Sequence, residues 1–191
     1  MADALLIVFS VLLALILNEV RNNWQERKQT RQLVENLRKE LVNNKHLLLE
    51  QYQYHLSVIH NIDSALTHES YRNQLFINDE FQLHMLGKEG IGLADFDQTA
   101  WEVAKSNNIM SKLDVTTMSL LNNIARQHLR IEKIEDGVAS VLLIQGARKK
   151  ENQRESLILM KDNYYGWAVK RVPGLLNTYN LAIKKLDTYL Q

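Results

Sequence analysis

The first apolar segment of the chain runs from Ala4 to Leu17, ALLIVFSVLLALIL, with one hydroxyl and no charge. Its apolar residues occupy every side of a helix, whereas a helix in a soluble domain usually keeps one polar face. The segment rises about 21 Å as a helix, so flanking residues or local thinning must make up the rest of a hydrocarbon core of about 30 Å. The pattern predicts a membrane anchor within residues 1–20. The residues expected to contact lipid are Leu5, Leu6, Ile7, Val8, Phe9, Leu12, Leu13, Leu15, Ile16 and Leu17.

A cleaved signal peptide and a buried core helix are the two alternatives to an anchor. A signal peptide needs a positive start and a small-x-small cleavage site. Here the start is only Met1-Ala2-Asp3, and the run ends in Leu15-Ile16-Leu17-Asn18-Glu19. A core helix would show a polar face, which this segment lacks. The membrane anchor is therefore the favoured interpretation of the three.

Basic residues follow the apolar segment on one side only, where they define a juxtamembrane stretch. They are Arg21, Arg27, Lys28 and Arg31. The positive-inside rule then predicts a single-pass membrane protein, with the helical domain of residues 21–191 in the cytoplasm. Trp24 lies about 10 Å beyond Leu17 along the helix, where it is either an interfacial anchor or an ordinary core tryptophan.

From Leu33 to Leu66 apolar residues recur at helical spacing without proline or glycine, which predicts a long amphipathic helix that continues the anchor. Heptad position a holds Val34, Leu41, Leu48, His55 and Ile62, and position d holds Leu37, Asn44, Gln51, Val58 and Ala65. The polar members Asn44, Gln51 and His55 form a candidate interaction seam, since such residues fix register or partner number in coiled coils. The alternative, an intramolecular helical bundle, is favoured because further apolar residues widen the buried face.

Beyond Thr67 the helical pattern breaks, and Gly87, Gly90 and Gly92 predict a loop that lasts until Asp97. Asp97 is then a helix cap for Gln98 to Ser106, and Asp114 caps a long helix with Ile124, Ile131 and Val138 on one seam. A helix over 151–172 should stop near Pro173, with one more amphipathic helix behind it. The fold class is all-α, with no alternating strand pattern.

The stretches LLIVFSVLLALILNEVRNNWQERKQTRQ, LVENLRKELVNN and FDQTAWEVAKSNNIMSKLD carry a resemblance. Together they are similar to an uncharacterised family of bacterial membrane-anchored helical proteins. In that family a short N-terminal hydrophobic helix leads into an Asn/Trp/Glu/Arg-rich juxtamembrane stretch, here Asn22 to Lys28, and then a helical domain. The resemblance covers about the first fifth of the chain and a piece of the middle. It implies the architecture and no activity.

The residues that carry chemistry are scattered. Lys plus Arg (23) balance Asp plus Glu (22), so no nucleic-acid partner is expected, and there is no cysteine. Two His/Glu pairs, at 46/50 and 128/132, have helical spacing for a metal or a surface contact. The basic stretch at 148–154 contains interleaved glutamates, and the aromatics at 164, 165 and 167, like Trp101, suit a core. No catalytic, cofactor or metal site is predicted.

Two functions follow from these patterns. The first is a membrane-anchored scaffold or partner-regulating subunit without catalytic activity, whose partners are the lipid bilayer and either another protein or further copies of the chain. The second is a membrane-tethered sensor that binds a small ligand in a cavity near Asn44, Gln51 and His55. An enzyme ranks behind both, because no acid-base pair, nucleophile or metal cluster stands out.

Overall fold

A computed structural model describes the fold of the chain except for residues 1, 79, 91–94, 108, 144–145 and 147–148. The side chains of residues 2–8, 83, 109, 132, 134–135, 138 and 141–143 also lie outside the described set. The described chain is mostly helical, so the all-α prediction is confirmed. The predicted seam residue Val138 is among those whose side chains are not described.

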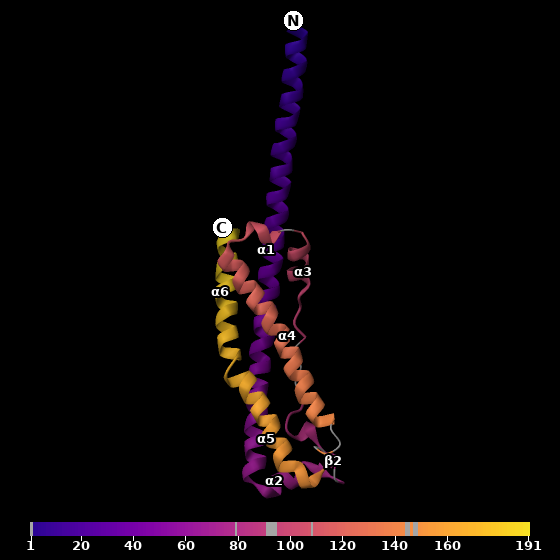
Figure 1. The fold of residues 1–191 in the computed structure, drawn as a ribbon. Coiled ribbons are helices and arrows are strands. Elements are labelled where there is room, and N and C mark those ends of the chain that lie inside the picture. Colours follow the sequence, from indigo (N-terminus) through magenta and orange to yellow (C-terminus); the bar gives the residue numbers. More distant parts are fainter. Residues whose placement is uncertain (1, 79, 91–94, 108, 144–145, 147–148) are drawn as a thin grey trace.

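Helix α1, Ala2–Thr67, joins the predicted anchor to the predicted amphipathic helix in one unbroken element of 66 residues. No residue within it is proline or glycine, the two residues that most readily kink or end a helix. Its N-terminal part projects beyond every other element, and the remainder runs along the domain (Figure 1). One helix therefore forms both the projection and the axis of the fold.

The other helices pack along the second half of α1. They are α2 (Glu69–Gln74), α3 (Thr99–Ser106), α4 (Val115–Leu143), α5 (Gln153–Tyr164) and α6 (Val172–Leu190). α6, α5 and α3 contact α1 directly, and α4 packs against α6 and α5. All ten a and d residues predicted on α1 are buried, including the polar Asn44, Gln51 and His55. The heptad pattern thus identified the face of α1 that the other helices cover.

The prediction of a loop between Thr67 and Asp97 was wrong in part. After α2 the chain forms a small antiparallel hairpin of β1 (Phe76–Ile77) and β2 (Glu80–Phe81), and then the 3-10 helix η1 (Leu83–Met85). The rings of Phe76 and Phe81 lie 5.0 Å apart across the hairpin, which buries Phe76. Strands of two residues are too short to show alternation, so no periodicity could reveal them. Gly92 lies outside the described residues.

The predicted helix cap at Asp114 is confirmed, because Asp114 Oδ1 accepts a hydrogen bond from Thr117 N (3.0 Å) at the start of α4. The cap predicted at Asp97 is wrong by one residue: Gln98 occupies the cap position of α3 and makes no side-chain cap, while Asp97 Oδ1 accepts a hydrogen bond from Thr99 N (2.9 Å). Hydrogen bonds from Thr117 and Tyr189 hold the pKa of Asp114 well below its ordinary value. Between α3 and α4 lies the 3-10 helix η2 (Ile109–Lys112).

Proline has a different place from the one expected. After the 3-10 helix η3 (Lys150–Asn152), α5 passes directly into a π-helical turn, η4 (Tyr165–Val169), which ends before Pro173. Pro173 occupies the first turn of α6, where its missing N–H costs no hydrogen bond. It therefore begins the last helix and does not stop the preceding one.

Candidate functional site

The projecting part of α1 exposes apolar side chains on every side. Between Phe9 and Trp24 each described residue is exposed, and the large apolar ones show 44% to 64% of their surface. They are Phe9, Val11, Leu12, Leu13, Leu15, Ile16, Leu17, Val20 and Trp24. The side chains of Leu5, Leu6, Ile7 and Val8, which belong to the predicted anchor, are not among those described. Exposed apolar surface on this scale is typical of sites that contact a membrane or another protein.

Within the described residues, no helix has an apolar stretch of sufficient length to cross a membrane.

The juxtamembrane residues predicted after the anchor lie on the exposed helix just before it enters the domain. Trp24 is 62% exposed, so it is not a core tryptophan. The ammonium of Lys28 lies 5.5 Å from the centre of its ring, within the range of a cation–π contact. Arg21 and Arg27 are also exposed. An aromatic ring and four exposed basic side chains therefore lie on one side of α1 in this stretch.

Polar contacts fasten the end of the domain to α1, and we name them the collar. Lys112 of η2 forms an ion pair with Glu26, and Arg38 forms one with Asp187 of α6. Arg31 Nη2 donates a hydrogen bond to the carbonyl of Leu190 (2.7 Å). These contacts join the end of α6 and η2 to the helix that projects.

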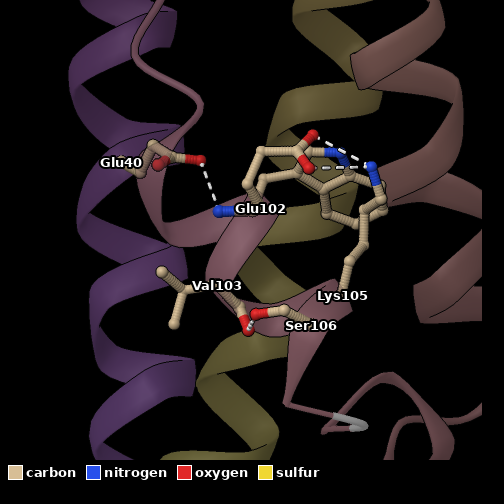
Figure 2. Close-up of polar contacts among 6 residues, drawn as sticks. Glu40, Glu102, Val103, Lys105 and Ser106 are labelled. Carbon is tan, nitrogen blue, oxygen red and sulfur yellow. Dashed lines mark hydrogen bonds and ion pairs between the residues drawn. The ribbon is translucent and has the colours of Figure 1, made fainter.

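A second set of polar contacts, the latch, holds the start of α3 against α1. Asn44 Nδ2 donates to the carbonyl of Asp97 (2.6 Å), and Asn44 Oδ1 accepts from the N–H of Asp97 (3.0 Å). One turn earlier, the Glu40 carboxylate accepts hydrogen bonds from the N–H groups of Ala100 (2.5 Å) and Trp101 (3.2 Å). Figure 2 shows Glu40 pointing from α1 to the first turn of α3.

The latch explains why polar residues occupy the buried face of α1. The first N–H groups of a helix lack internal partners, and a carboxylate satisfies them and matches the helix dipole. Burial nevertheless raises the pKa of Glu40 above its ordinary value, against the lowering effect of these N–H groups. Asn44 was a predicted seam residue, whereas Glu40 was missed because a lone glutamate on a helix looks like an exposed charge. Glu40 and Asn44 both form hydrogen bonds with backbone groups of the same chain.

Gln51 and His55, the other two seam residues, are buried further along α1. The His55 ring lies 5.0 Å from the ring of Tyr164 on α5, and 5.9 Å from Tyr54. Trp167 in the π-helical turn is buried as well. The predicted use of Tyr164 and Trp167 in the core is confirmed, as it is for Trp101, while Tyr165 remains 43% exposed.

His128 and Tyr179 form a buried polar pair between α4 and α6. The His128 Nε2 and the Tyr179 hydroxyl lie 2.5 Å apart, and the imidazole stacks on Phe96 at 4.3 Å. Burial lowers the pKa of His128 to about 4, so the ring is neutral at pH 7, and burial raises the pKa of Tyr179. Neither group is then poised for proton transfer near neutrality.

A small cavity lies between the latch and His128. Its volume is about 10 Å³, and its wall includes Glu40, Asn44, Trp101 and His128. This is room for about one water molecule and not for an organic ligand.

The two His/Glu pairs with helical spacing do not assemble a metal site in the described part of the chain. His46 and Glu50 are exposed and lie 3.4 Å apart, which is the surface contact that their spacing allowed. The side chain of Glu132, the expected partner of His128, is not described. Among the described side chains no group of three His, Asp or Glu residues is close enough to hold a metal ion. In the basic stretch, Lys149 pairs with Glu151 at 3.6 Å.

Comparisons of the chain with protein-family models, with curated proteins and with solved structures found no match. The fold and its contacts define the chain as a mostly helical protein with one projecting apolar helix.

Proposed function

We propose that this chain is a membrane-anchored helical scaffold or regulatory subunit. In this proposal the projecting part of α1 enters a bilayer, and the helices packed around the rest of α1 form a bundle that meets its partner away from the lipid. The partner is another protein or a further copy of this chain. In this proposal the basic residues after the apolar segment place the domain in the cytoplasm, and the resemblance to bacterial membrane-anchored proteins suggests the bacterial inner membrane.

One observation carries this proposal: the exposed apolar segment continues, as the same helix, into the axis of the domain (Figure 1). Side chains such as Leu15 and Ile16 are about 60% exposed, which is costly in water and favourable in hydrocarbon. Trp24 and the basic residues beside it follow at the level where an interface with lipid headgroups would lie.

The buried polar groups support a structural use of the seam. Glu40 accepts a hydrogen bond from α3, Asn44 donates one to Asp97 just before α3, and His128 contacts the Tyr179 hydroxyl. The sensor hypothesis requires a cavity near Asn44, and the cavity there has room for about one water molecule. We therefore place the scaffold hypothesis first.

The anchor is tested by alkaline extraction of membranes that contain the full chain with a C-terminal tag. Wild-type protein should stay in the membrane pellet. The variant Leu12→Arg/Ile16→Arg places two charges one turn apart in the apolar segment, and each costs about 2.5–3.5 kcal/mol near the centre of a bilayer. It should be released into the supernatant.

Leu129→Arg is the matched control, because Leu129 is similarly exposed but lies on α4. It should remain in the pellet with the wild type. Protease treatment of sealed inner-membrane vesicles of known orientation then reports the side of the domain. Extraction of the wild type by alkali, or equal extraction of both variants, contradicts the anchor.

The scaffold role is tested separately on detergent-purified protein. Mass measurement should show an oligomer, or affinity capture should recover a reproducible protein partner that the domain retains. A monomer without such a partner contradicts the scaffold role and leaves the anchor untouched.

A further inference from the structure

A groove of about 470 Å³ lies beside α1 where that helix leaves the domain. Asn23, Glu26, Arg27 and Arg31 of α1 form one wall, and Lys112 of η2 and Tyr189 of α6 form the other. The volume is within the range of sites that hold small molecules. Because these elements are joined by the collar, the groove is part of the folded domain and not a gap beside a loose helix.

Cations predominate along this groove, with three basic side chains against one acidic one. Arg31 is already engaged, since it donates to Leu190 O and its Nε lies 3.5 Å from Glu35. Its guanidinium is therefore held in place as part of the groove wall. Arg27 forms no ion pair with any described residue, so its five N–H donors remain for a ligand.

Lys112 is the second donor that a ligand can recruit. Its partner Glu26 is 57% exposed, so water solvates that carboxylate when the ammonium turns to another anion. The amide of Asn23 adds a neutral donor on the same wall. A guanidinium, an ammonium and an amide around one space suit an oxyanion with several oxygens, and a phosphate is the common one.

The position of the groove indicates where that phosphate comes from. Arg27 is seven residues beyond Val20, which is about 10 Å along the helix. Side chains on a helix tilt toward its N-terminus, so the side chain of Arg27 extends toward the proposed bilayer. The headgroup layer of one leaflet is about 5–7 Å thick, and a long arginine reaches it.

We propose that this groove binds the phosphate headgroup of an anionic phospholipid in the leaflet that faces the domain. This inference rests on the proposed membrane anchor and adds a specific ligand to it. Arg27 and Lys112 bind the phosphate oxygens, and Trp24, whose ring faces Lys28, lies at the same interface. A lipid held there joins the collar to the bilayer.

The test uses the full chain reconstituted in nanodiscs that contain equal amounts of phosphatidylglycerol and phosphatidylcholine with the same acyl chains. Native mass spectrometry then counts the lipids that remain bound to the released protein. Wild-type protein should retain phosphatidylglycerol in preference to phosphatidylcholine. Arg27→Gln should reduce that preference about fivefold, and Arg27→Lys should keep most of it, because the charge near the surface is retained.

Arg126→Gln is the matched control, since Arg126 is an exposed arginine on α4, outside the groove. It should leave the preference unchanged. Equal retention of both lipids by the wild type overturns the headgroup site. An equal loss of the preference for phosphatidylglycerol in Arg27→Gln and Arg126→Gln overturns it as well. Binding of inorganic phosphate that depends on Arg27, without any preference for phosphatidylglycerol, overturns the lipid as the source of the anion. Failure of the anchor itself is distinct, because the chain is then extracted by alkali before any lipid is counted.

Discussion

Replacement of Asn44 by alanine should separate α3 from α1 and lower the stability of the whole domain. The two hydrogen bonds between the Asn44 amide and the backbone of Asp97 are lost together. A typical hydrogen bond contributes about 1 kcal/mol net, so the pair contributes about 2 kcal/mol. Water can replace part of this at Asp97, whose surface is exposed, which keeps the loss near that figure and not above it.

Asn43→Ala is the control for this change. Asn43 is the neighbouring residue on α1, has the same side chain and is exposed. Both variants gain the higher helix propensity of alanine, so the difference between them isolates the latch. We expect Asn44→Ala to unfold with a free energy about 2 kcal/mol lower than that of Asn43→Ala, and at a temperature about 4–8 °C lower.

Urea unfolding of the full chain in detergent, followed by circular dichroism at 222 nm, measures the difference. Hydrogen exchange gives a local measurement, because the Asp97 N–H, which donates to Asn44 Oδ1, should lose protection in Asn44→Ala alone. A difference between the two variants below about 0.5 kcal/mol, with unchanged exchange at Asp97, would refute the latch as a stabilising contact.

Two further predictions concern His128 and Gly87. Because burial lowers the folded-state pKa of His128 from 6.5 to about 4, the unfolded chain binds the extra proton between these values. The free energy of unfolding is therefore highest above pH 6.5, and the share due to His128 falls by about 3 kcal/mol as the pH drops toward 4. His128→Gln should remove this part of the pH dependence of urea unfolding. The control His46→Gln, which changes an exposed histidine, should keep it. A Cβ at Gly87 would overlap the Tyr54 hydroxyl, so Gly87→Ala should lose about 1–3 kcal/mol in thermal unfolding. Gly137→Ala, with nothing within 4 Å, should gain about 0.5–1 kcal/mol, and a gain in both glycine variants would contradict the contact.

The sequence allowed the helices and the buried face of α1 to be predicted because these depend on local periodicity. Residues such as Leu37, Leu48 and Ile62 recur with the spacing of one helix face, and burial follows that spacing whatever covers it. The cap at Asp114 was also predictable, since an aspartate at a cap position bonds to backbone only three residues ahead.

The contacts that give the site its shape could not be predicted in this way. Glu40 meets Ala100 and Trp101 across 60 and 61 residues of sequence, and Lys112 meets Glu26 across 86. The local sequence pattern does not show which distant residues pair, because a charged residue that caps a distant helix has the same pattern around it as a charged residue that is exposed to water. The hairpin at Phe76 was missed because two-residue strands have no measurable period.

In the proposed anchored state, the length of α1 sets how far the domain can reach from the bilayer. From Val20 to Thr67 the helix rises about 70 Å without a proline or glycine at which it could bend. With the projection in a bilayer and inclined by about 20°, an ordinary tilt, the far end of α1 moves sideways by about 24 Å. A small change in the tilt of the anchor therefore displaces the distal end of α1 by a large lateral distance. Neighbouring helices or lipids that change this tilt would change which partners the domain can contact.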